Sequence, residues 1–219
     1  MCIRDRLTAT DTNWSVVAAT LDTALAANVR LAGNLTVTGI KSDDEANAST
    51  AYSTGATTGA TNVTLTASDG TWSVAASALG TDIINNIEYA GALTVTAISS
   101  GNKASALTAY TTSITGATTN KLTSDGSWSV ATATLDTALT AGVRLAGNLI
   151  VTGISTETNA STTYSKTATG ASNVMLTASD GTWTVAASAL NADISSSIKY
   201  AGALKAVSYT HLTLPTILL

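Results

Sequence analysis

A repeated tryptophan phrase constrains this chain more than any other feature. Each tryptophan lies in a phrase of the form Asp-Gly-Thr-Trp-Ser-Val or a variant of it, and successive tryptophans are 58, 56 and 55 residues apart. The four are Trp14, Trp72, Trp128 and Trp183. A nearly fixed period of this kind is typical of a tandem array in which one structural unit recurs. The sequence therefore predicts a repeat architecture with units of about 55 residues.

The units alternate between two types. Residues 14–40 match residues 128–154 at 22 of 27 positions, and residues 72–93 match residues 183–204 at 15 of 22. The duplicated block is therefore a pair of units, about 112 residues long. We expect a first block over residues 7–117, with units 7–62 and 63–117, and a truncated second block over residues 118–206, with units 118–173 and 174–206.

The two ends do not follow the repeat. Residues 1–6 resemble the translation of an adapter used in sequencing libraries, and residues 207–219 resemble the same adapter translated from the opposite strand. Segments that come from processing are set aside before a fold is inferred. We expect both ends to be artefacts that flank a metagenomic fragment of a longer reading frame, and to take no part in the packing of the repeat.

Composition excludes several kinds of chemistry. The single Cys, His and Pro all fall in the two ends, as Cys2, His211 and Pro215. Without thiols or imidazoles, the repeat cannot form Cys or His nucleophile–base pairs, histidine zinc sites or CxxC redox pairs. An acidic chain without a Lys/Arg cluster lacks the electrostatic features of nucleic-acid binding, and no apolar run is long enough to span a membrane. We therefore expect no nucleic-acid partner and no membrane insertion. We also expect no enzyme, because no set of acidic and basic side chains is visible that could act together in catalysis.

The local pattern of the second unit predicts a hairpin. Residues 63–67 alternate between apolar and polar side chains, as a half-buried strand does. The following Ser-Asp-Gly at residues 68–70 is a turn signal, because Gly and Asp tolerate the backbone of tight hairpins. Residues 71–76 then form the returning strand, with Trp72 and Val74 on the core face.

The rest of the unit predicts one helix and two strands. Apolar residues recur every four positions at Leu79, Ile83 and Ile87, and the same spacing occurs in the other three units, which favours a short amphipathic helix. Gly91 is placed to end that helix. We expect an alternating strand at residues 93–97 and a further strand, rich in Thr and Tyr, at residues 106–114.

Taken together, these phrases resemble a known family. The Asp-Gly-Thr-Trp-Ser-Val strand, the Ala-Gly-Ala-Leu-Thr-Val-Thr-Ala-Ile strand and the Gly-Asn-Lys-Ala-Ser of residues 101–105 are similar to the Ig-like repeats of large bacterial adhesins. The resemblance implies a mainly β fold, with tandem Ig-like β-sandwich repeats and one short helix per unit. The competing fold is a β-solenoid, but 55 residues with a helix and a hairpin is long for one solenoid coil.

The resemblance also implies a function. Repeats of this family act as non-catalytic spacers or stalks of secreted or cell-surface proteins. Their partners are the neighbouring repeats, and host or biofilm ligands would bind through regions outside this fragment. The alternative is a carbohydrate- or surface-binding module of a phage or cell-surface fibre. A spacer should bury its tryptophan in every unit, whereas a binding module should expose at least one Trp or Tyr in a groove.

Few residues are candidates for a site. Each tryptophan faces the same way as a Val two residues later, so we expect a structural core at Trp14, Trp72, Trp128 and Trp183. The only acidic cluster, Asp43-Asp44-Glu45, offers the carboxylate oxygens that calcium prefers. The other units do not repeat this cluster, and Ser99-Ser100 stand where the family keeps an Asp before Gly-Asn. We therefore expect no cofactor and little or no dependence of stability on calcium.

Overall fold

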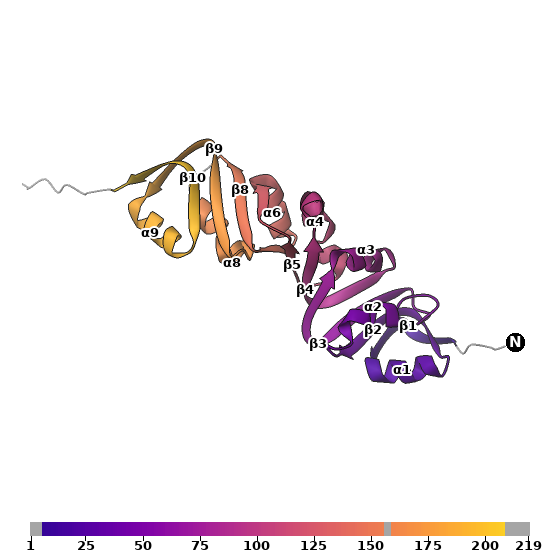
Figure 1. Ribbon diagram of the computed structural model, residues 1–219. Helices are drawn as coiled ribbons and strands as arrows, with labels where there is room; N and C mark the ends of the chain where they lie inside the picture. The colour runs from indigo at the N-terminus through magenta and orange to yellow at the C-terminus, as the bar shows by residue number, and fades with distance from the viewer. Residues whose placement is uncertain (1–5, 156–158, 209–219) are drawn as a thin grey trace, which may run out of the picture.

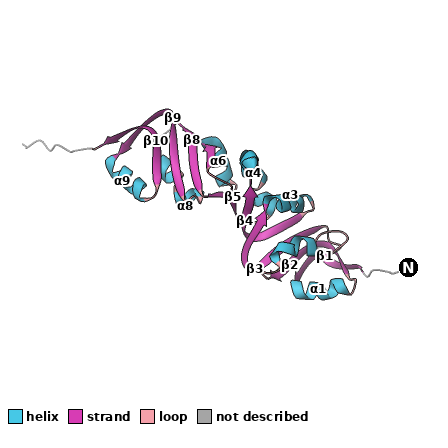
Figure 2. Ribbon diagram, viewed as in Figure 1, coloured by secondary structure: helices cyan, strands magenta, loops and turns pink. Residues whose placement is uncertain are grey.

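The computed structural model describes residues 6–155 and 159–208, which contain both strands and short helices (Figures 1 and 2). The strands are β1 (Arg6–Val17), β2 (Arg30–Ile40), β3 (Asn62–Ala75), β4 (Ile87–Ile98), β5 (Thr119–Ser124), β6 (Trp128–Ala131), β7 (Val143–Ala146), β8 (Asn148–Ile154), β9 (Asn173–Ala186) and β10 (Ile198–Val207). The α-helices are α1 (Ala18–Ala26), α2 (Glu45–Ala51), α3 (Ala76–Ile84), α4 (Lys103–Ala109), α5 (Thr112–Thr115), α6 (Thr132–Thr140), α7 (Ala160–Thr163), α8 (Lys166–Thr169) and α9 (Ala187–Ser195). A 3₁₀ turn, η1 (Ser100–Asn102), precedes α4.

The expected tandem Ig-like β-sandwich is wrong. The strands form two sheets, in the orders β1-β2-β3-β4-β5-β7 and β6-β8-β9-β10, and every described strand pair is parallel. An Ig-like sandwich needs antiparallel strands joined by hairpins, whereas parallel neighbours need a crossover, here supplied by helices. The chain is an α/β array in which at least one helix lies between the two strands of every described pair.

The hairpin prediction failed because the Asp-Gly phrase does not reverse the chain. β3 continues without interruption through Asp69 and Gly70, and its pairing with β4 is parallel on both sides of them. Its pairing with β4 passes from Thr66–Ala90 to Thr71–Ala92, so four residues of β3 lie opposite one residue of β4. The same positive-φ glycine that could close a hairpin here forms a large bulge within a parallel pair.

Two further local predictions were wrong, and one was confirmed. Residues 106–114 form α4 and α5 instead of a strand, with Ala106 and Leu107 buried. Gly91 lies in the middle of β4, and the helix before it already ends at Ile84, two residues before the left-handed Asn86. The helix predicted from Leu79 and Ile83 is present as α3, although Ile87 already belongs to β4.

The first two units each contain two strands and the helices that follow them, and in the third unit the two strands are divided into four shorter ones, β5 to β8. This content removes the length objection to a solenoid-like array. The two strands of a unit are long and bend together near their middle. In the second unit, the first half of β3 pairs backward with β2, and the second half of β4 pairs forward with β5. Units are therefore joined by parallel ladders, and β1 and β10 lie at opposite extremities of the described chain (Figure 1).

One face of the strands carries the core. In β3, Val63, Leu65 and Trp72 are buried against the helices, whereas the alternate positions Thr64 and Thr66 remain partly exposed. β-branched threonine suits such a half-exposed pleated surface. The alternation predicted from the sequence is therefore present, although the strands it describes are parallel.

The two terminal segments that we expect to be artefacts fall mainly at residues 1–5 and 209–219, outside the described residues. Within the described ranges, Arg6 begins β1 and Val207 ends β10. No helix of these ranges is long and apolar enough to cross a membrane.

Candidate functional site

The bend of each strand pair is the feature that recurs most closely, and we call it a corner. A corner consists of an Asp-x-x-Trp phrase in one strand and an Ala-Gly pair in the next. The corners are corner 1 (Asp11–Trp14 with Ala32–Gly33), corner 2 (Asp69–Trp72 with Ala90–Gly91), corner 3 (Asp125–Trp128 with Ala146–Gly147) and corner 4 (Asp180–Trp183 with Ala201–Gly202).

The tryptophan makes the same hydrogen bond in every corner. Its indole N–H donates to the carbonyl oxygen of the neighbouring alanine, at 2.9 to 3.1 Å. Trp72, Trp128 and Trp183 are buried, and Trp14 at the N-terminal corner is partly exposed. In corners 2 and 4 the indole also packs edge-on against a tyrosine, with ring centroids 4.9 and 4.8 Å apart. A buried indole whose N–H is satisfied acts as a structural anchor and offers no stacking platform to a ligand.

The bulge of corner 2 lies directly over the neighbouring glycine. Gly70 has φ 74°, and the Asp69 carboxylate accepts a hydrogen bond from the Thr71 backbone N–H at 2.9 Å. That hydrogen bond lowers the pKa of Asp69. A Cβ on Gly91 would lie only 2.4 Å from the Gly70 carbonyl oxygen, so this position accepts only glycine. Corner 4 repeats this arrangement with Asp180, Thr182 and Gly202.

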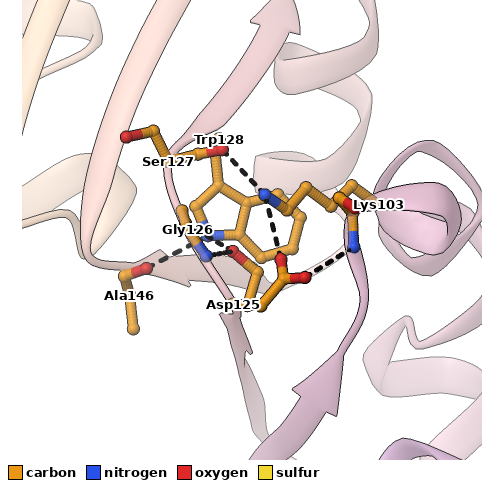
Figure 3. A network of polar contacts seen from close by, with 8 residues as sticks. Lys103, Asp125, Gly126, Ser127, Trp128 and Ala146 are labelled. Atoms are coloured by element: carbon orange, nitrogen blue, oxygen red, sulfur yellow. Dashed lines mark hydrogen bonds and ion pairs between the residues drawn. The ribbon is translucent and has the colours of Figure 1, made fainter.

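Corner 3 is built differently, as Figure 3 shows. The Asp125 carboxylate accepts from the Ser100 backbone N–H at 3.1 Å and forms an ion pair with the Lys103 ammonium at 3.4 Å. Lys103 also donates to the Ser127 carbonyl oxygen at 2.9 Å, and its nitrogen lies 5.9 Å from the Trp128 ring centroid. A cavity of about 410 Å³ adjoins this cluster, between α4 and β6. The ammonium therefore links α4 to both sides of the Asp125–Trp128 phrase and holds the corner together.

The acidic candidates Asp43, Asp44 and Glu45 do not converge. Asp43 and Asp44 are exposed in the turn before α2, and Glu45 begins that helix. Across residues 6–155 and 159–208, no three His, Cys, Asp or Glu side chains are grouped to hold a metal ion. Burial, and secondarily the negative charge of Asp69, raise the pKa of Glu45, and its Oε1 atom has no hydrogen-bond partner. These side chains form no calcium site in this arrangement.

The sequence analysis missed a set of tyrosine–carboxylate pairs. Tyr52 donates to Asp22 and Tyr164 to Asp136, both at 2.9 Å, and each pair lines a cavity between helices, of about 530 and 290 Å³. Burial and the adjacent carboxylate raise the pKa of both tyrosines to about 12. These phenols are therefore poor proton donors at neutral pH, and their hydroxyl groups are already paired.

A second kind of pair lies in the core. Tyr89 donates to the buried Asp82 at 2.6 Å, and Tyr200 donates to the buried Asp193. The fixed spacing of seven residues between Asp and Tyr in both units is a sequence signal that could have identified these pairs.

Asparagines also form ladders across neighbouring strands, at exposed positions. Asn62 donates to Asn34 at 2.8 Å, and Asn34 donates to Asn13 at 3.0 Å. Asn173 and Asn148 repeat the contact at 2.9 Å. Side-chain ladders of this kind are typical of stacked parallel strands.

Comparison with known proteins adds no relative: no family model, no curated protein and no solved structure matches this chain. The arrangement must therefore be interpreted from its own geometry. In the described part of the chain, the polar groups that recur from unit to unit are turned toward one another, in corners, ladders and tyrosine–carboxylate pairs.

Proposed function

We propose that this chain is a non-catalytic structural spacer, in which a repeated α/β unit builds an extended segment of a larger protein. The observation that carries the proposal is the corner. One tryptophan–alanine hydrogen bond recurs at four positions, and the units are joined by continuous parallel ladders. In such arrays each unit contacts mainly its neighbours, so length increases with unit number.

The exposed surface supports the same proposal. The solvent-facing positions of the strands carry mainly Thr, Ser and Asn, and only 11% of the chain is charged. A polar surface with few charges stays hydrated without attracting polyelectrolytes. The location of the protein at a bacterial surface or outside the cell stays a prediction that comes from the sequence alone.

The alternative, a carbohydrate- or surface-binding module, has less support. Sugar-binding grooves use exposed aromatic faces, whereas Trp72, Trp128 and Trp183 are at most 2% exposed. Tyr52 and Tyr164 do line cavities, but each is 6% exposed and has its hydroxyl group paired.

Small-angle scattering combined with ligand screening tests the proposal. We expect an elongated particle whose dimensions do not change when calcium, a chelator or soluble polysaccharides are added. Tryptophan fluorescence should also stay constant across the polysaccharide series. Compact scattering, or saturable quenching by one polysaccharide, would contradict the spacer role and favour the binding module.

A further inference from the structure

The last strand of the array exposes side chains that are buried at every other equivalent position. Leu204 in β10 is 43% exposed, whereas its counterparts in β2, β4 and β8 are each 1% exposed. These counterparts are Leu35, Leu93 and Leu149. Two residues further along, Ala206 is exposed where Val37, Val95 and Val151 are fully buried.

Each of the three buried leucines lies beside a residue of the next strand in its sheet, and Leu204 has no such neighbour on that side among the described strands. β3 pairs with β2 so that Val63 lies beside Leu35, and β9 pairs with β8 so that Val174 lies beside Leu149. β5 pairs with β4 in the same way. The second half of β10 pairs with β9 on one side, and no other described strand pairs with its opposite side.

We propose that this open edge of β10, residues 203–207, is a docking site for a parallel strand of the pattern Asn-Val-x-Leu-Thr. That pattern occurs twice in this chain, in Asn62–Thr66 and Asn173–Thr177, and both copies occupy the equivalent edge of a neighbouring unit. The partner is therefore a repeat unit of the same kind, added by strand augmentation. This interaction rests on the spacer function, since it is the step by which such an array is lengthened.

The test uses the full chain and a fluorescent peptide of residues 62–68, Asn-Val-Thr-Leu-Thr-Ala-Ser. We expect a saturable rise in anisotropy, together with slower amide exchange at residues 203–207. A peptide carrying Val63→Lys and Leu65→Lys should not bind. The chain variant Leu204→Lys should lower the affinity at least about tenfold, whereas Ile84→Lys, on the exposed face of α3, should leave it unchanged.

Three results would overturn the proposal. The first is that the peptide shows no saturable binding up to millimolar concentration. The second is that the Leu204→Lys variant binds the peptide as tightly as the unchanged chain does. The third is that the chain self-associates in sedimentation experiments and that Leu204→Lys abolishes this self-association. The third would show that a second copy occupies the edge. Failure of the spacer function itself is distinguishable, because it would appear in the scattering and polysaccharide measurements, which do not depend on this edge.

Discussion

Corners 2 and 3 have almost the same sequence but different structures. In corner 2, β3 and β4 continue through the bend, Gly70 adopts φ 74°, and its carbonyl oxygen covers Gly91. In corner 3, both strands are interrupted, giving β5 and β6 on one side and β7 and β8 on the other. A Cβ on Gly147 would meet no atom within 4 Å. The sheet divides into two at this corner.

The difference comes from one missing residue. Between the shared Leu-Thr and Asp-Gly, corner 2 has Ala67 and Ser68, whereas corner 3 has only Ser124. With one residue fewer, the bulge cannot extend over the neighbouring strand, and Asp125 turns to Ser100 and Lys103 instead. The comparison teaches that loop length, more than the Asp-Gly phrase itself, determines whether the strands continue.

Replacing the tryptophans should produce the largest effect. Trp72→Ala and Trp128→Ala each remove a buried indole and its hydrogen bond, so we expect each to lower the free energy of unfolding by about 3–5 kcal/mol. Trp14→Ala is the matched control and should cost less, because Trp14 is only partly buried. Denaturant unfolding followed by circular dichroism measures the three values. A loss below about 1 kcal/mol for Trp72 or Trp128 would show that the corner is not an anchor.

The glycines of the two corners should respond differently to the same substitution. Gly91→Ala places a Cβ 2.4 Å from a backbone carbonyl oxygen, whereas Gly147→Ala meets open space, although both glycines have positive φ. We expect a loss of about 2–4 kcal/mol for Gly91 and about 1 kcal/mol for Gly147, the latter from backbone strain alone. Thermal melts of the two variants measure and compare these losses of stability. Equal losses would mean that the carbonyl contact does not distinguish the corners.

The features of the corners also separate what local sequence patterns could predict from what they could not. The period, the short helices and the inward positions such as Val63 and Leu65 follow from local patterns, and all are present. Parallel pairing did not follow, because Asp69-Gly70 has the same local signal in a hairpin turn and in a bulge. The deciding contact is with Gly91, some twenty residues further along the chain, and it becomes visible only when the strands are placed side by side.

The candidate site residues show the same limit. Asp43, Asp44 and Glu45 are adjacent in sequence, but adjacent carboxylates converge only if the backbone turns them inward, and here it does not. The tyrosine–carboxylate pairs were missed although the sequence contained a usable signal. The units with Tyr89 and Tyr200 carry Asp82 and Asp193, whereas the unit with Leu145 carries Ala138 at the same two positions. Because the Asp and the Tyr are present together or replaced together, the sequence indicates that the two side chains are in contact.

Breaking one of these pairs should cost more than exchanging it. Tyr89→Phe leaves the buried Asp82 carboxylate without its donor, and we expect a loss of about 1–3 kcal/mol. The double variant Asp82→Ala with Tyr89→Leu copies Ala138 and Leu145, which are both buried, and should lose less than the single variant. A double-mutant cycle measured by denaturant unfolding checks this. Strict additivity would show that the two side chains are not coupled.

The same pairs predict a loss of stability at high pH. Burial and the Asp193 carboxylate raise the pKa of Tyr200 to about 12, above the ordinary value near 10. A tyrosine with a raised pKa contributes stability that is complete below about pH 10 and is lost as the pH rises through the folded-state value. Tyr200→Phe should flatten the decline between about pH 10 and 12. An unchanged profile would contradict the assignment.

Lengthening corner 3 by one residue should make it resemble corner 2. Inserting Ala between Thr123 and Ser124 restores the length of the bulge, so we expect Asp125 to bond within its own loop and the interrupted strands to join. Slower amide exchange at residues 125–128 would report the change. The same insertion in corner 2, next to Ala67, is the control and should speed exchange there. If the insertion left corner 3 unchanged, sequence differences elsewhere would have to account for the break.

The smallest expected effect concerns the charge at the start of the helix that follows each Ala-Gly strand. Glu45 in α2 and Lys103 in α4 occupy equivalent positions, seven residues before a tyrosine. Lys103 is paired with Asp125, whereas the pKa of Glu45 is raised by burial and by Asp69.

A carboxyl group with a raised pKa favours folding at low pH and opposes it once the pH exceeds that value. Glu45→Gln should therefore stabilise the chain at neutral pH and have little effect at about pH 4, whereas Lys103→Gln should destabilise it at neutral pH. Both changes should stay below about 1 kcal/mol, because the groups are partly exposed. Thermal melts at the two pH values separate the signs, and a destabilising Glu45→Gln would show that the ionised carboxylate has a partner that stabilises it.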